Sequence, residues 1–191
     1  MNKNVLVVLS GPSGVGKGTI AEIIRKDLDF SLSISCTTRL PREKEINGRE
    51  YFFISKEEFA KKLNSGGFLE YSEHFGNFYG TPKEFVINKL KEKDVLLEID
   101  VNGGLSVKKN YPNAVLIMVI PPSLEELKSR LIKRHSETEQ QINERLLRIE
   151  YELEKKQFYD YVVVNDDLTV AVNEIKNIIS KEKFKENNYD T

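Results

Sequence analysis

A glycine-rich segment near the start of the chain constrains the fold more than any other feature. An apolar run at residues 5–9 directly precedes this segment, which consists of Gly11, Pro12, Ser13, Gly14, Val15, Gly16 and Lys17. A buried strand followed by such a loop and then a helix is typical of phosphate-binding loops. The glycines let backbone N–H groups turn toward phosphates, the helix N-terminus adds positive potential, and the lysine can bridge two phosphate groups. The segment therefore predicts a nucleoside triphosphate site rather than a glycine-rich surface turn.

The residue after Lys17 departs from the usual pattern, in which a serine or threonine hydroxyl reaches a magnesium ion. Here that position is Gly18, and Thr19 supplies the nearest hydroxyl. The ending is similar to that of adenylate kinases, in which phosphates and water hold most of the magnesium. The pattern therefore favours a nucleotide kinase over a signalling GTPase.

Composition excludes several classes of function. The chain of 191 residues, 39% of them hydrophobic, suits one domain with a single core and an inserted lobe. Its 29 basic and 30 acidic side chains give a net charge of -1, which argues against a nucleic-acid partner. No apolar stretch could span a membrane, so we expect no membrane partner and a cytoplasmic location. One cysteine, Cys36, and two histidines, His74 and His135, offer little scope for disulfides, zinc or a serine triad.

Hydrophobic periodicity predicts the elements of the core. Residues at helical spacing follow the loop, at Ile20, Ile23, Ile24 and Leu28. A second strand is expected over residues 30–36. The apolar runs at residues 95–99, 115–120 and 161–164 lack strict alternation, as expected of parallel strands covered on both faces. These runs predict an α/β fold with a central parallel sheet.

The final segment of the chain reads as a helix. Its apolar face carries Ala171, Ile175 and Ile178, and the polar residues 181–191 that follow are expected to fray. Three residue pairs fit the capping box that begins a helix: Ser55 with Glu58, Ser123 with Glu126, and Thr138 with Gln141. Thr81 and Pro82 are expected to open another helix.

The chain is expected to form one domain of three parts. Residues 37–81 change character, because glycines interrupt short aromatic runs such as residues 51–54, and we interpret them as an inserted lobe. Residues 133–137 form a polar hinge between two helices, which indicates a mobile lid at about residues 125–152. The core then consists of residues 1–36, 82–124 and 153–191.

Further motifs closely resemble those of guanylate kinases, in family order and at family spacing over nearly the whole chain. They lie at residues 33–42, 48–53, 68–70, 76–81, 98–100, 121–123 and 164–167. The resemblance implies a three-layer P-loop nucleoside monophosphate kinase fold, with a mixed α/β GMP-binding lobe and a helical lid. It also implies transfer of the γ-phosphate of ATP to GMP, with Mg²⁺ as cofactor.

Guanine presents hydrogen-bond donors at N1 and its 2-amino group and an acceptor at O6. By the resemblance, Glu70 faces the donor edge, while Ser35 and Thr81 donate toward O6. Glu98 and Asp100 either help at the base or hold magnesium through water, and position 98 is commonly aspartate in the family. Taken singly, each of these residues could equally be a capping or surface polar residue.

Two arginines and two tyrosines are candidates to hold the phosphate of GMP. Arg39 and Arg42 can form bidentate contacts, and Tyr51 and Tyr79 can add phenolic hydrogen bonds. The alternative for the arginines is a solvated loop, and for the tyrosines it is packing within the lobe.

By the resemblance, Arg130, Arg134 and Arg145 surround the phosphoryl group during transfer, with Arg148 a weaker candidate. Glutamates interleave with these arginines, so the alternative is a charged helix face. Asn165 either lies along the edge of the adenine or caps a turn. His135 stands where the family commonly has a glycine, and Asn102 stands where it commonly has a glutamine.

The sequence leaves two other functions open. One is a guanylate-kinase-like binding module for phosphorylated peptides, although Lys17 and the lid arginines are retained. The other is a kinase for a different phosphorylated acceptor, against which Glu70, Ser35 and Thr81 argue. Monomer and homo-oligomer are equally compatible with the sequence.

Overall fold

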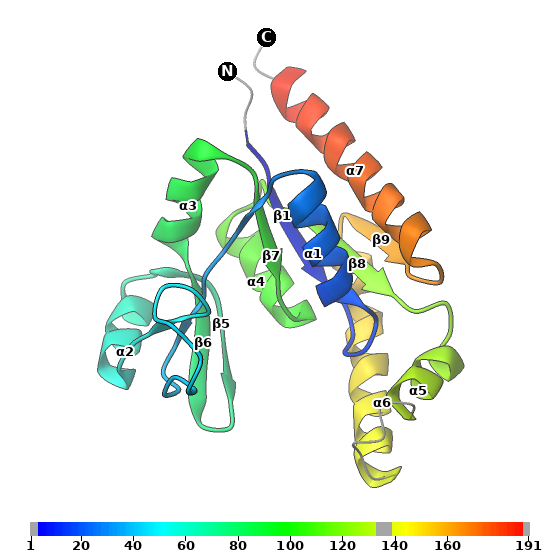
Figure 1. The fold of residues 1–191 in the computed structure, drawn as a ribbon, viewed down its shortest axis with the longest axis horizontal. Coiled ribbons are helices and arrows are strands. Elements are labelled where there is room, and N and C mark those ends of the chain that lie inside the picture. Colours follow the sequence, from blue (N-terminus) through cyan, green and yellow to red (C-terminus); the bar gives the residue numbers. More distant parts are fainter. Residues whose placement is uncertain (1–3, 133–138, 189–191) are drawn as a thin grey trace.

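A five-stranded parallel sheet forms the centre of the molecule (Figure 1). The computed structural model describes residues 4–132 and 139–188, with side chains described outside residues 129–145 and 186–188. The strand order is β2-β7-β1-β8-β9. The strands are β1 (Leu6–Ser10), β2 (Ser31–Leu32), β7 (Val95–Glu98), β8 (Val115–Ile120) and β9 (Tyr161–Val164). The predicted central parallel sheet is therefore confirmed.

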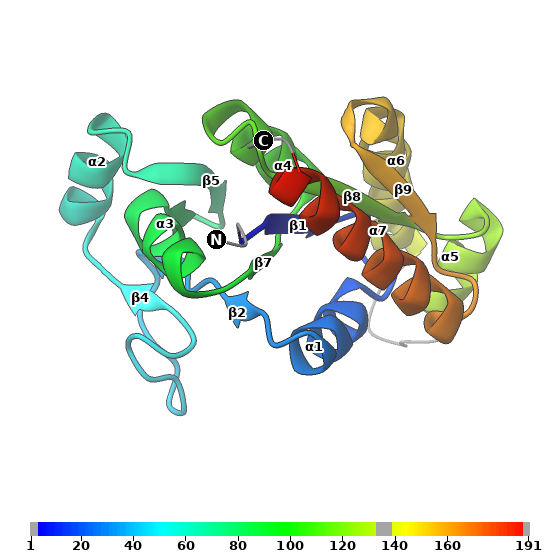
Figure 2. The same cartoon turned by 90° about the horizontal axis from the view of Figure 1, so that it is seen from above.

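Helices cover both faces of this sheet, because β1 points alternate side chains into two separate cores. Val7 and Leu9 pack with α1 (Lys17–Asp27) and α7 (Leu168–Asn188). Leu6 and Val8 pack with α3 (Lys83–Glu92) and α4 (Val101–Asn110) on the other side. The result is the three-layer α/β arrangement expected from the sequence, seen from above in Figure 2.

The turn from β1 into α1 requires glycine. Gly11 has φ +147°, and a Cβ on it would collide with the carbonyl oxygen of Val119 in β8. Gly16 caps α1 with φ +96°, another conformation that side chains rarely adopt. The glycine-rich segment therefore lies tightly against the neighbouring strand.

A second sheet of four strands belongs to the inserted part of the chain, in the order β4-β3-β6-β5. Its strands are β3 (Cys36–Thr37), β4 (Phe52–Phe53), β5 (Phe68–His74) and β6 (Asn77–Pro82). Helix α2 (Lys56–Asn64) packs on it through Phe59, whose ring stacks on Phe68 at a centroid distance of 4.5 Å. This small core is separate from the two cores of the large sheet.

Two further helices follow β8. Helix α5 (Leu124–Ile132) and helix α6 (Glu139–Glu154) meet around Leu127 and Ile149, and a short 3-10 helix (Lys155–Phe158) leads into β9. The capping box of Ser55 and Glu58 is present, and the Ser123 hydroxyl accepts the backbone N–H of Glu126. The expected hinge at 133–137 and the cap at Thr138 lie outside the described residues.

The prediction of one strand over residues 30–36 was wrong. Ser31–Leu32 pairs with β7 in the large sheet, whereas Cys36–Thr37 pairs with β4 and β6 in the small one. The chain therefore passes from the large sheet to the small sheet between residues 32 and 36, because the two ends of this segment pair with strands of different sheets. Thr81 does not open a helix either, because it lies within β6. Pro82, the last residue of that strand, is the N-cap of α3.

The expected fraying from residue 181 was also wrong for residues 181–188, because α7 extends to Asn188; residues 189–191 lie outside the described residues. Two side chains tie this stretch to the sheet. The Lys183 ammonium lies 2.6 Å from Asp94, and the Tyr161 hydroxyl donates to Glu182 at 2.5 Å. No helix among the described residues is long and apolar enough to cross a membrane.

Asp94 joins three distant parts of the chain, so we expect its loss to weaken the fold. It is 6% exposed, accepts the N–H of Val5 at 2.9 Å, and pairs with Lys183. Asp94→Ala should lower the free energy of unfolding in urea by about 2–3 kcal/mol, because a buried N–H loses its acceptor.

The matched control is Asp27→Ala, which breaks the more exposed pair of Asp27 with Lys176 between α1 and α7. It should cost less than about 1 kcal/mol. Equal losses in the two variants would contradict a special role for Asp94.

Candidate active site

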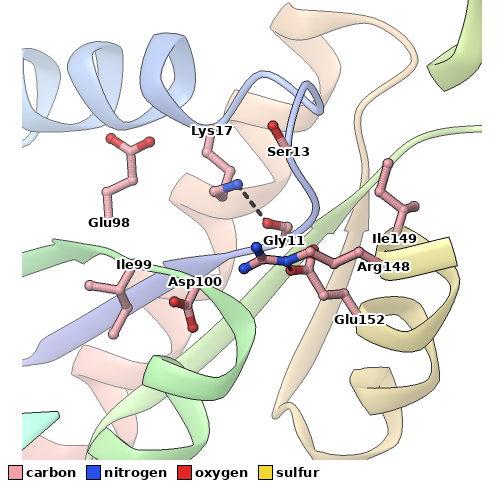
Figure 3. Close-up of a pocket in the computed structure, with 9 residues that line it drawn as sticks. All are labelled: Gly11, Ser13, Lys17, Glu98, Ile99, Asp100, Arg148, Ile149 and Glu152. Atoms are coloured by element: carbon pink, nitrogen blue, oxygen red, sulfur yellow. Dashed lines mark hydrogen bonds and ion pairs between the residues drawn. The ribbon is translucent and has the colours of Figure 1, made fainter. Parts of the chain in front are cut away.

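A crevice opens where β1 and β7 end. Helix α1, after β1, packs on one face of the sheet and α4, after β7, packs on the other, so the two connections diverge. Ligands of parallel α/β sheets bind at such points. A cavity of about 410 Å³ lies here, and Figure 3 shows the residues that line it: Gly11, Ser13, Lys17, Glu98, Ile99, Asp100, Arg148, Ile149 and Glu152. We call this the loop cavity.

Lys17, the first residue of α1, bends back over the glycine-rich loop (Figure 3). Its ammonium donates to the carbonyl oxygens of Gly11 at 2.6 Å and Pro12 at 2.9 Å. Burial lowers the pKa of Lys17, while Glu98, Glu152 and Asp100 oppose that shift. The lysine is thus a half-buried cation held by weak backbone acceptors, which an anionic ligand can replace.

Two carboxylates from the end of β7 face this lysine across the cavity. Asp100 caps α4, accepting the N–H of Gly103 at 2.8 Å. Glu98 is exposed and lies beside Gly18, where an added Cβ would sit 3.6 Å from its carboxylate. That is ordinary van der Waals contact, so a side chain at position 18 would fit.

No group of three or more histidine, cysteine or acidic side chains that could hold a metal ion occurs in the part of the chain that the structure describes. Thr19, the hydroxyl next to Gly18, is exposed and does not line the loop cavity, whereas Ser13 of the loop does. Glu98 and Asp100 bring carboxylate oxygens, the kind of ligand that hard cations prefer, to the lining of this cavity.

Helix α6 contributes three residues to the loop cavity, Arg148, Ile149 and Glu152. Arg148 donates through Nε to Glu152 at 3.0 Å, and Glu152 is only 8% exposed. Burial raises the pKa of Glu152, opposed chiefly by its hydrogen bond to Arg148. Arg148 was only a weaker candidate from the sequence and Glu152 was not predicted, because an Arg-Glu pair at i,i+4 is common on solvated helices.

A second cavity, of about 470 Å³, adjoins the first and faces the small sheet. We call it the lobe cavity. It brings together six predicted residues: Ser35, Arg42, Tyr51, Glu70, Tyr79 and Asp100. Ile99 and Asp100 line both cavities, so the two spaces meet at the end of β7. Ser72, His74 and Phe75 also line the lobe cavity and were not predicted.

Glu70 is a buried carboxylate within the lobe cavity. It is 7% exposed, and it accepts the Thr81 hydroxyl at 2.5 Å. Burial raises its pKa and Asp100 adds to the rise, whereas the hydrogen bond from Thr81 opposes it. Thr81 was predicted to donate to the ligand, but its hydroxyl donates to Glu70 instead. Thr81 therefore does not line the lobe cavity itself and holds the carboxylate that does.

Arg39 does not line either cavity. Its guanidinium forms a two-pronged pair with Glu45, at 2.9 and 3.0 Å, and lies 5.6 Å from the centre of the Tyr51 ring. The hydrogen bond from Arg39 lowers the pKa of Glu45 to about 2. The arginine is therefore held next to the lobe cavity by a carboxylate.

The remaining predicted residues lie elsewhere or are not described. The side chains of Arg130 and Arg145, and all of Arg134 and His135, lie outside the described residues. Asn165 lines neither cavity and instead donates from its side chain to the Val15 carbonyl at 2.7 Å. Asn102 is exposed on α4.

Comparison with known proteins agrees with this arrangement. A family model described as guanylate kinase matches residues 3–182. The guanylate kinase of Clostridium tetani is 50% identical over 186 residues, covering 97% of this chain and 89% of that protein. The guanylate kinase of Clostridioides difficile is 47% identical over 191 residues, covering 99% and 93%.

A solved structure gives the same result. The crystal structure of guanylate kinase from Anaplasma phagocytophilum matches with a TM-score of 0.72 and 33% identity, covering 95% of this chain and 87% of that chain. The sequence motifs, the two adjoining cavities and these matches lead to one conclusion: the chain belongs to the guanylate kinase family.

Proposed function

We propose that this protein is an ATP-dependent guanylate kinase, which transfers the γ-phosphoryl group of ATP to GMP and releases ADP and GDP. The observation that carries the proposal is the junction of the two cavities at Ile99 and Asp100. A phosphate chain on the glycine-rich loop and a nucleotide in the lobe cavity would meet there, as phosphoryl transfer requires.

Glu70 would select guanine. A carboxylate accepts hydrogen bonds from guanine N1–H and its 2-amino group, whereas adenine would leave a buried charge unpaired. The Thr81 hydroxyl already donates to Glu70, which fixes the carboxylate in the lobe cavity. Ser35, which also lines the lobe cavity, would donate its hydroxyl to O6.

Arg42, Tyr51 and Tyr79 would hold the phosphate of GMP, since all three line the lobe cavity. Arg39 would join them by exchanging Glu45 for the phosphate, because both partners accept two parallel hydrogen bonds from a guanidinium. Asp100 lines both cavities, and Glu98 lines the loop cavity.

The transfer itself would depend on positive charge around the γ-phosphoryl group. Lys17 would leave the carbonyls of Gly11 and Pro12 for the phosphates, and the remaining backbone of residues 11–19 would surround them. Magnesium, bound mainly by phosphate and water oxygens, would neutralise part of their charge. The GMP phosphate is anionic at neutral pH and can attack without a general base.

We propose that the lid comprises residues of about 125–152 and the GMP-binding lobe residues 37–81, with the rest as core. Arg130, Arg134 and Arg145 would stabilise the transferring group when the lid closes. Arg148, which lies in the loop cavity, would act with them. ATP and GMP would be the small-molecule partners, and the free Cys36 thiol is compatible with a reducing cytoplasm as the location.

The decisive test is ADP formation from magnesium-ATP with GMP, AMP, CMP and UMP offered separately. We expect turnover with GMP alone. Lys17→Ala should lower kcat by roughly 10²–10³-fold, because it removes a preorganised positive charge from the transition state. Lys26→Ala, which changes an exposed lysine in the same helix, is the control and should leave kcat unchanged.

Two outcomes would contradict the proposal. Binding of ATP without turnover of any acceptor would favour a non-catalytic binding module. Turnover of a nucleotide other than GMP would move the protein to a different kinase and withdraw the assignment of Glu70.

The raised pKa of Glu70 gives a second prediction. Guanine binds the charged carboxylate, so the KM for GMP should rise as the pH falls toward the pKa of this group. Glu70→Gln should raise the KM for GMP at pH 7 by about tenfold or more, leave the KM for ATP within about twofold, and remove that pH dependence. GMP titrates in both proteins, so the difference between them isolates Glu70.

Glu73→Gln is the matched control, since Glu73 is exposed on the same strand and lines neither cavity. Its KM values should equal those of the unchanged protein. Equal rises for GMP and ATP in Glu70→Gln would refute the assignment.

A further inference from the structure

We propose that Glu152 is a positioning residue for phosphoryl transfer, which holds the guanidinium of Arg148 in the loop cavity. The inference rests on the proposed function in taking this cavity as the place where the phosphoryl group is transferred. Glu152 lines the cavity, but it is not needed to bind ATP, GMP or magnesium in the reaction proposed above.

Two apolar neighbours on α6 fix the backbone around Glu152. Ile149 is 2% exposed and packs with Leu127 of α5. Leu153 packs against the same pair and also against the core between the large sheet and α4. Because both neighbours are held, the carboxylate enters the loop cavity from a fixed base near the end of α6.

Glu152 and Arg148 differ in how firmly each is held. The side chain of Glu152 is 10% exposed, whereas that of Arg148 is 61% exposed, and Arg148 Nε donates to Glu152 at 3.0 Å. A long, exposed arginine side chain samples many rotamers, and a fixed acceptor one turn along the helix selects those that reach it. The buried residue therefore orients the exposed one.

The contact leaves most of the guanidinium available to a ligand. A guanidinium carries five N–H donors in one plane, and the contact with Glu152 uses the donor on Nε. The donors on the two terminal nitrogens remain for phosphate oxygens, which accept parallel hydrogen bonds from such a fork. Figure 3 shows both side chains extending from α6 toward the glycine-rich loop, which lines the same cavity. Arg148 is therefore aimed at the place where the loop would hold phosphates.

The charge of Glu152 strengthens this hold on Arg148. A neutral amide would cost less to bury, but a charge-assisted hydrogen bond is roughly twice as strong as a neutral one. Burial raises the pKa of Glu152. Arg148 and Lys17 oppose that rise, and Asp100 adds to it. Tyr159 also faces the carboxylate: burial raises its pKa to about 12, and Asp100 and Glu152 add to the rise. Since a fall in pH protonates Glu152, the hold on Arg148 should weaken below the pKa of this carboxyl group.

A double-mutant cycle in turnover of magnesium-ATP and GMP tests the proposal. Arg148→Ala should lower kcat by about tenfold and leave both KM values within about twofold, because it removes a donor used mainly in the transition state. Glu152→Ala should lower kcat by about fivefold, because the arginine then loses its fixed orientation. The variant with both changes should resemble Arg148→Ala alone, since the carboxylate acts through the arginine.

The pH profile of kcat separates this role from a merely structural one. In the unchanged protein, kcat should fall as the pH drops toward the raised pKa of Glu152. Glu152→Gln keeps the size and an acceptor but not the charge, so its kcat should be lower at pH 7 and should lack this part of the fall. The control is Glu150→Gln, the same substitution at an exposed position of α6, which should behave like the unchanged protein.

Three results would overturn the proposal. The first is a loss of kcat in the double variant that multiplies the two single losses, about fiftyfold, because the residues would then act independently. The second is an unchanged kcat in Glu152→Ala. The third is a raised KM for ATP with kcat unchanged, because Glu152 would then serve binding of the nucleotide rather than transfer.

An NMR measurement on the protein without nucleotides tests the orientation itself. It therefore remains decisive if the protein fails to make GDP or if Glu152→Ala does not fold. The Nε–H of Arg148, assigned by its loss in Arg148→Ala, should exchange slowly with solvent, because it is hydrogen-bonded to a buried carboxylate. The Nε–H of the exposed Arg42 should exchange fast. Equally fast exchange at both arginines would refute the positioning role.

Discussion

Close contact between the glycine-rich loop and strand β8 is the constraint on which the rest of the site depends. Gly11 lies against the carbonyl of Val119 with no space for a side chain, and Val15 is fully buried in the core beneath the loop. The loop is therefore held by the central sheet rather than by solvent-exposed contacts. Because the loop is anchored in this way, Lys17 at the start of α1 lies in the same cavity as Glu98 and Asp100, which come from the end of β7 and the turn after it.

Burial of charge is the second theme of the site. Lys17, Glu70 and Glu152 are all mostly buried around the two cavities, and each has a pKa shifted by desolvation toward its neutral form. Such burial is costly to the empty protein. A ligand that brings phosphates to the lysine and hydrogen-bond donors to Glu70 would offset that desolvation cost. The buried charges would therefore favour ligands with this pattern of charge and donors.

Much of the candidate site was readable from the sequence, because its motifs combine residue type with spacing. Six of the nine residues predicted for GMP line one cavity. No local pattern pointed to Glu152, since the same i,i+4 pairing occurs on many solvated helices. It also led to a wrong strand over residues 30–36, because local β propensity carries no information about which sheet edge a strand meets.

The sequence by itself determined the fold class, the order of the elements and the glycine positions, since these follow from hydrophobic periodicity and from the conformations that only glycine adopts readily. Tertiary structure alone decided how distant segments meet. It joined Asn165 to Val15 across 150 residues, and Lys183 to Asp94, which keeps a polar segment helical. Such pairings depend on the geometry of the sheet, and no local pattern in the chain encodes them.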